Sequence, residues 1–495
     1  MFKTVIIFLV FLYSVYGKFL IEETLQSISD NLIIKENKSK NIHIKLPIYK
    51  DEVESKNKMT GTSANYNNIL VEKEGKAVIN TEIDADNVKK CQTDINENII
   101  SSQNSTLCEI PVKEDNGTAL ILTPFIEKGQ FDEARKASIV NSKLFLGVDS
   151  YSGFITVNKT YNSNIFFWYF PIDNKRVNET PWIIWLQGGP GASSLLGLFE
   201  EIGPFKLSPA GVLKKNPYTW LQNHSLVFID NPVGTGYSFT EQTEGFLKDM
   251  NTYATHLHEV VQQLLQIYPE LRSAPLYIAG ESYAGKYVPA LGIEIHKHKN
   301  IPGFEVNLQG LMIGNGLTDP QLISQATLPF YYFGLLDKEQ IKTIDPLIKL
   351  LQNDIATNKS VGAKMKWNLV VAVSLYLSHQ KHAYNFLKDE ITTKSYVNFL
   401  KTPEVKRALH VGDINYSAVN FTVNWYMATD FLSSSKKIFE ELLINYRVLA
   451  YCGNLDQMLP CVFLSEHYRT WKWNGSSEFL EATRYPYIYN SKLAG

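Results

Sequence analysis

Short apolar runs alternate with amphipathic stretches along most of the chain. Continuous apolar runs are typical of strands that are buried on both faces of a parallel sheet. Five such runs lie at residues 181–186, 226–229, 275–279, 308–313 and 447–451. Between the second and third runs, apolar side chains recur every three to four residues from Phe246 to Tyr268, which predicts an amphipathic helix that ends near Pro269. This alternation predicts a mostly parallel central sheet flanked by helices on both faces.

Two segments depart from this alternation. Residues 154–170 form two β-rich runs around a turn that contains Asn and Ser, which predicts a hairpin. Residues 319–430 are rich in helical, apolar sequence, with one helix expected over residues 335–351 and another that opens with Pro403 at its first position. We expect this segment to be a helical cap inserted above the carboxyl edge of the sheet, where ligands bind in open α/β sheets.

The start of the chain differs from the rest in composition. A basic start, a short apolar run and small residues make residues 1–17 a predicted signal peptide, because the run is too short to span a membrane. Residues 18–117 are largely polar, with few aromatic side chains, so we expect a flexible leader or propeptide. Residues 118–495 have the composition of a globular domain.

Composition and charge narrow the class of protein. The chain has 48 Lys and Arg against 50 Asp and Glu, a net charge of −2, so no nucleic-acid surface is expected. The four cysteines can form two disulfides, and we expect Cys91–Cys108 and Cys452–Cys461, with the connectivity open. Asn-x-Ser/Thr sequons occur at ten positions: Asn37, Asn104, Asn116, Asn158, Asn178, Asn223, Asn358, Asn415, Asn420 and Asn474. The seven within the globular domain are the candidate glycosylation sites.

A strand that runs into a turn of small residues marks the candidate nucleophile. The apolar run at residues 275–279 leads directly into Gly-Glu-Ser-Tyr-Ala-Gly at residues 280–285, and a helix is expected next. This order resembles the nucleophile elbow of an α/β-hydrolase, which lifts a serine hydroxyl above the sheet edge, so Ser282 is the predicted nucleophile. Because Ala284 holds the fifth position of the Gly-x-Ser-x-Gly pattern, an ordinary strand-to-helix loop is the alternative.

Two further features suit acyl transfer by Ser282. Such a serine needs a base, and its tetrahedral intermediate needs donors for the oxyanion. The glycine-rich residues 188–191 can bring backbone N–H groups close to a substrate, so Gly189 is a predicted donor, with Tyr283 as the second. A tight structural turn is the alternative for this loop. Asp456 follows the last apolar run and fits the acid of the Ser, Asp, His order, although an isolated aspartate is more often a solvated loop residue.

Four motifs in this order resemble the serine carboxypeptidases. They are Trp-Leu-Gln-Gly-Gly-Pro-Gly-Ala-Ser-Ser at residues 185–194, Phe-Glu-Glu-Ile-Gly-Pro at 199–204, the elbow at 280–285 and Tyr-x-Gly-x-x-Asp at 451–456. The glutamine of the first motif is most similar to the vitellogenic-carboxypeptidase-like branch. The resemblance covers roughly residue 118 to the end and implies an α/β-hydrolase fold.

The resemblance also implies a site for the free carboxylate of the substrate. Gln187 and Glu281 match the family residues that hold this carboxylate, with Glu201 supporting Glu281. Placing a third carboxylate beside two acids raises at least one pKa, and a shared proton then lets the acids donate hydrogen bonds to the substrate. Activity is therefore expected to be favoured at acidic pH. A satisfied loop acid is the alternative for Glu281. Ala192 stands where many members have a cysteine, so that disulfide is not expected.

The family's catalytic histidine has no counterpart in this sequence. In the family it lies in a Gly-His-x-x-Pro segment well after the aspartate, and none of the ten histidines has that context: His43, His224, His256, His258, His296, His298, His379, His382, His410 and His467. Only His467 follows Asp456, in a predicted helix, and the family shows the stretch around His410 for structural reasons. The domain is therefore expected to be incomplete at its C-terminus, or the enzyme crippled, because loss of the base costs several powers of ten in rate.

These observations predict a serine-type carboxypeptidase that releases single residues from peptide C-termini through an acyl-enzyme. No cofactor and no metal are expected, and the partners are peptide or protein C-termini, with no membrane span and a possible homodimer. A secreted or lysosomal location is expected. The alternatives are a carboxypeptidase-like acyltransferase that passes the acyl group to an alcohol, and a non-catalytic secreted protein that retains the peptide pocket.

Overall fold

The computed structural model describes residues 117–495 apart from 174, 389–393 and 494–495, and two short strands further upstream. The chain divides into two units, and residues 34–113 form the second of them. In that unit the structure describes only β1 (Leu70–Val71), which pairs antiparallel with β2 (Ala77–Val78). The expected signal peptide, the expected Cys91–Cys108 pair, His43 and the first three sequons lie outside the described residues.

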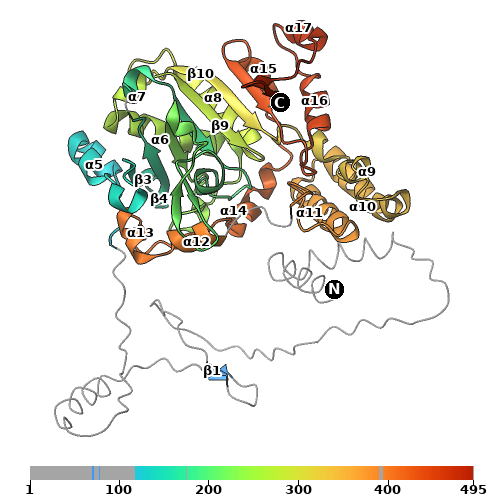
Figure 1. Cartoon of the computed structure of the whole chain (residues 1–495), viewed down its shortest axis with the longest axis horizontal. Coiled ribbons are helices and arrows are strands. Elements are labelled where there is room, and N and C mark those ends of the chain that lie inside the picture. Colours follow the sequence, from blue (N-terminus) through green and yellow to red (C-terminus); the bar gives the residue numbers. More distant parts are fainter. Residues whose placement is uncertain (1–69, 72–76, 79–116, 174, 389–393, 494–495) are drawn as a thin grey trace. The chain divides into compact units, whose positions relative to one another are not determined.

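A seven-stranded sheet forms the centre of the first unit, in the order β11-β10-β9-β5-β8-β4-β3 (Figure 1). The five strands from β11 to β8 are parallel to one another, and β4 and β3 join as an antiparallel hairpin at one end. Their bounds are β3 (Tyr151–Asn158), β4 (Ser163–Phe170), β5 (Trp182–Leu186), β8 (Ser225–Ile229), β9 (Leu276–Glu281), β10 (Leu308–Gly314) and β11 (Arg447–Tyr451). The predicted mostly parallel sheet and the hairpin are confirmed.

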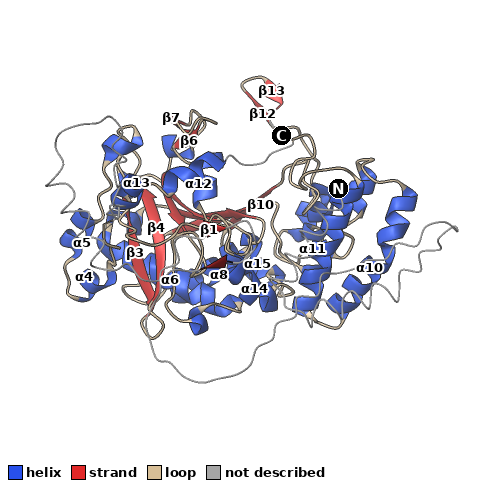
Figure 2. Ribbon diagram, turned by 90° about the horizontal axis from the view of Figure 1, so that it is seen from below, coloured by secondary structure: helices blue, strands red, loops and turns tan. Residues whose placement is uncertain are grey.

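Helices cover both faces of this sheet, and β5 shows why its sequence is continuously apolar. Trp182, Ile184 and Leu186 point into one hydrophobic core, whereas Ile183 and Trp185 point into a second core on the opposite face. Figure 2 shows α6 (Met250–Ile267) and α8 (Ala284–His298) on one side of the sheet and α12 (Lys394–Leu400) on the other. A strand between two helical layers needs apolar residues at every position.

Local capping decides where the helices begin. The helix expected from Phe246 begins at Met250, because the side chain of Asp249 accepts a hydrogen bond from the backbone of Thr252 at 3.0 Å and so caps α6. The helix expected from residue 335 is α10 (Lys338–Ala356), where Asp337 forms a reciprocal capping box. Both helices are confirmed, but each begins three or four residues later than predicted, because the apolar pattern starts before the N-cap residue.

The segment expected to be a cap is helical in the structure. It contains α9 (Leu328–Tyr332), α10, α11 (Ser360–Leu377), α12, α13 (Pro403–Ala408) and α14 (Phe421–Tyr426). Helices α9, α10 and α11 lie together beside α16 (Cys461–Tyr468), as Figure 1 shows. Pro403 is the first residue of α13, as predicted. No helix in the described part of the chain is both long and apolar enough to cross a membrane.

Candidate active site

Ser282 lies at a strained turn between β9 and α8. Its φ is +58°, a left-handed conformation that is unfavourable for a residue with a side chain. Two backbone hydrogen bonds hold it there, because the Ser282 N–H donates to the Gly314 carbonyl at 3.0 Å and the Leu317 N–H donates to the Ser282 carbonyl at 2.8 Å. This is the geometry of a nucleophile elbow, and the Ser282 residue remains partly exposed.

The glycine loop after β5 packs directly against this turn. A Cβ atom at Gly188 would lie 2.6 Å from the backbone nitrogen of Tyr283 and 2.8 Å from the Cβ of Ser282, so only glycine fits. Gly189 follows with a φ of +111°. In the described part of the chain, neither the Gly189 N–H nor the Tyr283 N–H donates to another protein group. Two free donors beside a serine are what an oxyanion hole requires.

Three polar side chains meet next to Ser282. Gln187 is 5% exposed, and its Nε2 donates to Glu281 Oε1 at 2.5 Å. The Trp185 indole fixes the amide orientation, because its Nε1 donates to Gln187 Oε1 at 2.8 Å. Glu201 shares a hydrogen bond with Glu281. The structure thus brings together the three residues to which the family resemblance gives the role of holding a substrate carboxylate.

Burial sets the ionisation of this acid pair. It raises the pKa of Glu201 well above its usual range, and repulsion from Glu281 raises it further. Burial also raises the pKa of Glu281, although the hydrogen bonds from Gln187 and Glu201 oppose that rise. A pair of carboxyl groups that share a hydrogen bond keeps at least one proton between them at acidic pH.

Asp456 lies on a loop that β10 and β11 hold in place. Its Oδ1 accepts a hydrogen bond from the Met458 N–H at 2.7 Å. Asn315, directly after β10, bonds the side chain of Asp456, accepts from the Gly453 N–H at 2.8 Å and donates to the Leu459 carbonyl at 3.0 Å. The sequence interpretation missed Asn315, although its position just past a strand, like that of Ser282, was a usable signal.

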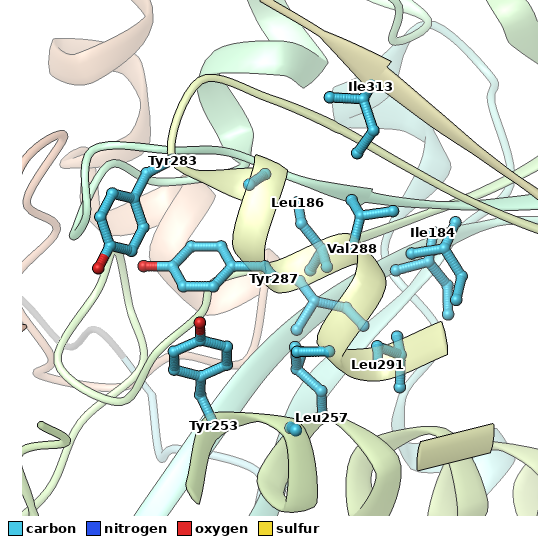
Figure 3. Close-up of a cluster of buried hydrophobic side chains, with 14 of the residues drawn as sticks. Ile184, Leu186, Tyr253, Leu257, Tyr283, Tyr287, Val288, Leu291 and Ile313 are labelled. Atoms are coloured by element: carbon cyan, nitrogen blue, oxygen red, sulfur yellow. The ribbon is translucent and has the colours of Figure 1, made fainter. Parts of the chain in front are cut away.

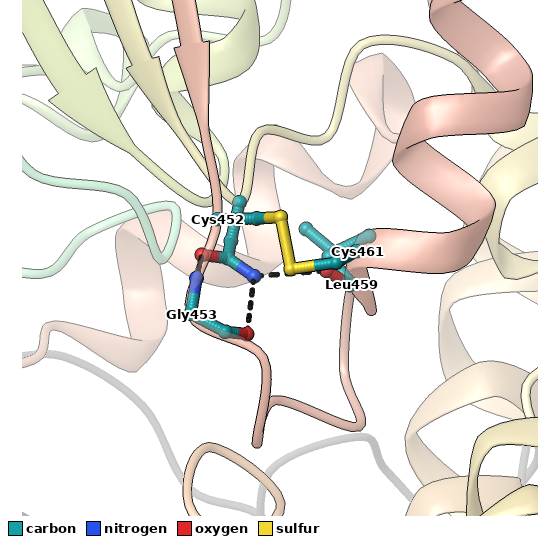
Figure 4. Close-up of a disulfide and its surroundings, with 5 residues drawn as sticks. Cys452, Gly453, Leu459 and Cys461 are labelled. Atoms are coloured by element: carbon teal, nitrogen blue, oxygen red, sulfur yellow. Dashed lines mark hydrogen bonds between the residues drawn. A yellow bond between two sulfur atoms is a disulfide. The ribbon is translucent and has the colours of Figure 1, made fainter. Parts of the chain in front are cut away.

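A disulfide closes the loop that carries Asp456. Cys452 and Cys461 are bonded, with their Cα atoms 5.6 Å apart, as predicted (Figure 4). Strands β9, β10 and β11 are adjacent and parallel, so their carboxyl ends place Ser282, Asn315 and the Asp456 loop along the same sheet edge. Burial raises the pKa of Asp456 to about 7, which the field of Glu281 reinforces and bonds from Met458, Leu459 and Asn315 oppose.

Comparison with known proteins identifies the family of this chain. The sequence profile of the serine carboxypeptidase family matches residues 141–495. The chain belongs to the serine carboxypeptidase family. It is 37% identical to the probable serine carboxypeptidase CPVL of Homo sapiens over 398 residues, 76% of this chain and 81% of that protein. The vitellogenic carboxypeptidase of Aedes aegypti is 36% identical over 405 residues, 77% of this chain and 83% of that protein.

A solved structure confirms the fold of this serine carboxypeptidase family member. The prohormone-processing carboxypeptidase of Saccharomyces cerevisiae superimposes with a TM-score of 0.60 at 24% identity, over 69% of this chain and 83% of that chain. The predicted α/β-hydrolase fold is therefore confirmed, and so is the membership in a family of hydrolases. Among the residues that the structure describes, no group of three or more His, Cys, Asp or Glu side chains could hold a metal ion.

Two of the described histidines are bonded to groups other than Ser282 and Asp456 in this serine carboxypeptidase. Within the part of the chain that the structure describes, no hydrogen bond joins an imidazole to Ser282 or Asp456. His410 lies 3.3 Å (Nδ1) from the hydroxyl of Ser152 on β3, at the opposite end of the sheet from β11. His467 lies on α16 as predicted, where its Nε2 accepts from the indole of Trp471 at 3.0 Å. Both rings have structural partners.

Backbone hydrogen bonds fasten the glycine loop where many serine carboxypeptidases have a cysteine. Next to Ala192, the Ser193 N–H donates to the Ala418 carbonyl at 3.0 Å. The Asn420 N–H donates to the Gly191 carbonyl at 2.8 Å. These bonds anchor both sides of Ala192 to the strand-like residues before α14, so the loop has a fixed attachment without a disulfide.

The candidate glycosylation positions differ in the exposure and the hydrogen bonding of their asparagine side chains. Asn420 is tied down, because its Oδ1 accepts from the Thr422 N–H at 2.9 Å and its Nδ2 donates to the Gly234 carbonyl at 2.7 Å. A glycan on that nitrogen would leave it a single N–H for the second bond. Asn158 is half-buried, and the other five are exposed: Asn178, Asn223, Asn358, Asn415 and Asn474. Glycosylation of these positions remains a prediction.

Proposed function

We propose that this serine carboxypeptidase releases the last residue of peptides through an acyl-enzyme on Ser282. The observation that carries the proposal is the group of Gln187, Glu281 and Glu201 beside a strained, partly exposed serine. A hydrolase of internal peptide bonds has no use for two half-buried acids with raised pKa values next to its nucleophile. A free C-terminal carboxylate is the substrate group that such a pair can hold through hydrogen bonds.

The chemistry follows the usual course of acyl transfer. Ser282 Oγ attacks the carbonyl carbon of the last peptide bond while a base takes its proton, and the oxyanion lies against the N–H groups of Gly189 and Tyr283. The C–N bond then breaks, and the departing amino group receives the proton. Water attacks the ester next, which releases the shortened peptide and restores the serine hydroxyl.

Among the described residues, no hydrogen bond joins an imidazole to Asp456. Burial raises the pKa of Asp456 to about 7, and an adjacent imidazolium would lower that pKa again. We propose that a histidine outside the described residues lies beside Asp456 in the active enzyme. Without an imidazole beside Asp456, bound peptides are expected to turn over slowly.

Chemical rescue tests this proposal. The full chain is incubated at about pH 7, where half of the added imidazole is free base, with benzyloxycarbonyl-Phe-Leu and with or without roughly 100 mM imidazole, and free leucine is measured by mass spectrometry. We expect added imidazole to increase leucine release at least about tenfold, and Ser282→Ala to abolish the increase. The matching peptide with a C-terminal amide should react poorly. Equal release by Ser282→Ala would refute the role of Ser282.

A non-catalytic peptide-binding protein is the second candidate, because no hydrogen bond joins a described imidazole to Asp456. A protein of this kind would bind the peptide acid, but added imidazole would cause no release of leucine that depends on Ser282.

We also propose entry into the secretory pathway, which the disulfide between Cys452 and Cys461 supports because such bonds persist in oxidising compartments. Removal of the leader at residues 18–117 and the cap assignment at residues 319–430 remain part of this proposal.

A further inference from the structure

Residues 430–435, at the end of the inserted helical segment, form hydrogen bonds with the first turn of α8. Ser435 Oγ donates to the carbonyl of Gly285 at 2.7 Å. Lys286 is fully buried, and its Nζ donates to the carbonyls of Asp430 and Phe431 at 2.6 and 2.9 Å. Residues 430–435 are therefore hydrogen-bonded to the residues that directly follow the nucleophile elbow.

One further contact of this stretch reaches the elbow itself. Tyr283 OH donates to Asp430 Oδ2 at 2.7 Å, and both residues are at least 95% buried. Lys286 Nζ lies farther from the same oxygen, at 3.8 Å, and Tyr253 OH reaches it from α6 at 3.4 Å. Figure 3 shows the rings of Tyr283, Tyr287 and Tyr253 grouped with their hydroxyl ends close together.

From this geometry we propose that Asp430 is a positioning residue that fixes the orientation of the Tyr283 N–H as an oxyanion donor. The proposal rests on the proposed function, in which that N–H stabilises the tetrahedral intermediate. Asp430 touches no reacting atom and acts only through the side chain of Tyr283.

The peptide unit between Ser282 and Tyr283 is held at both of its ends. On one side, the Ser282 carbonyl accepts from the Leu317 N–H at 2.8 Å, and the Ser282 N–H is bonded to Gly314. On the other side, the Tyr283 ring is anchored at its far end by Asp430. Turning the N–H away from the glycine loop would require the buried ring to leave its carboxylate. A donor held in this way needs no reorganisation when the oxyanion forms.

A purely structural role for Asp430 is the competing explanation, since its carboxylate also partners a buried lysine. The two roles make different predictions for ligands with and without a tetrahedral centre. A structural role affects both ligands alike through loss of folded protein. A positioning role weakens only the ligand that places an oxygen at the donor, because ground-state contacts with Gln187 and Glu281 do not involve the Tyr283 N–H.

The experiment measures two dissociation constants on the full chain by calorimetry. N-acetyl-phenylalanine boronic acid forms a bond from Ser282 Oγ to boron, releases the hydroxyl proton to the buffer and leaves a tetrahedral boronate with an oxygen at the oxyanion donors. Benzyloxycarbonyl-Phe-Leu serves as the ground-state probe. The variants are Tyr283→Phe, Asp430→Ala, the double variant and Asp430→Asn, with Tyr253→Phe as the matched control, because it removes a hydroxyl from the same carboxylate without touching the elbow.

We expect Tyr283→Phe and Asp430→Ala each to weaken boronate binding about tenfold and dipeptide binding less than about twofold. The double variant should be no worse than either single one, since both remove the same bond. Asp430→Asn, which retains an acceptor for the tyrosine, should recover most of the affinity, and Tyr253→Phe should match the wild type.

Two other outcomes overturn different statements. If Tyr283→Phe binds the boronate as tightly as the wild type while Ser282→Ala does not bind it, the positioning role is wrong and the proposed function stands. If the wild type and Ser282→Ala bind the boronate equally, the proposed function fails and the positioning role with it. Should Asp430→Ala not fold, Tyr283→Phe alone decides between these outcomes, because it removes only one hydroxyl.

Discussion

The conformations of Ser282 and Gln187 are fixed by neighbouring groups that take no part in the proposed reaction. Ser282 keeps a left-handed backbone only because Gly314 and Leu317 hold it from two sides. Gln187 keeps its amide pointed at Glu281 because Trp185 occupies the amide oxygen. Strained or fixed residues of this kind reduce stability locally, and the surrounding hydrogen bonds offset that loss.

The acid pair makes peptide binding dependent on pH. The pKa values of Glu201 and Glu281 are both raised, so the protonated pair persists at acidic pH and loses its proton as pH rises through those values. Two charged acids repel a substrate carboxylate, so we expect the affinity for benzyloxycarbonyl-Phe-Leu to fall about tenfold from pH 4.5 to 7.5. Titration calorimetry on Ser282→Ala, which cannot turn the peptide over, measures this slope.

Glu281→Gln in the same background should flatten the slope, because the amide cannot lose a proton. Glu179→Gln, which alters an exposed acid paired with Arg176, is the matched control and should leave the slope unchanged. The peptide amide should bind weakly at every pH. A slope that survives in Glu281→Gln would show that other groups cause the pH dependence.

At the scale of elements, three neighbouring strand ends build the site. Strand β9 carries the elbow, β10 carries Asn315 and β11 leads into the loop of Asp456. Asn315 binds this loop at the backbone of Gly453 and Leu459 and at Asp456 itself. The position of Asp456 therefore depends on a side chain from the strand next to its own.

Removing that side chain should loosen the loop. We expect Asn315→Ala to lower the free energy of unfolding by about 1–3 kcal/mol, since it leaves a backbone N–H and a carbonyl without partners. Hydrogen exchange of the amides in residues 453–459 should speed up. Asn307→Ala is the matched control, because Asn307 bonds Ser273 near the opposite end of β10 and should leave these amides protected. Unchanged exchange in Asn315→Ala would contradict the anchoring role.

The elements and the elbow could be predicted from sequence because their determinants are local. The elbow, the glycine loop and the Asp456 loop are each a short motif beside an apolar run. Asn315 and Asp430 could not be assigned in this way, since their partners lie 138 and 147 positions away along the chain. Nothing in a single sequence gives the pairing of distant polar groups, which only the packed sheet and the inserted segment bring together.

At the scale of the whole molecule, β11 is an exposed edge. It is the last strand of the sheet within the described residues, and Leu449 is 54% exposed on it, with Tyr451 at 37%. An exposed, apolar edge strand offers unpaired backbone groups to another chain. This edge is a candidate contact surface for the possible homodimer.

Charging the edge should therefore reduce self-association. We expect Leu449→Lys to raise the dissociation constant for self-association at least about tenfold, because a buried lysine would have to lose its hydration. Sedimentation velocity over a range of protein concentrations measures this change. Ile139→Lys, at a residue that is also 54% exposed but bridges to β3 at the other end of the sheet, is the matched control. Equal association of the wild type and Leu449→Lys would exclude this edge as the contact.

The contact between Gly188 and the elbow limits how this site can be redesigned. Because any Cβ at Gly188 would overlap both Ser282 and the backbone of Tyr283, the two loops cannot vary independently. A designer who grafts the serine turn onto another scaffold must therefore transplant the glycine loop with it, as one inseparable module drawn from two strands.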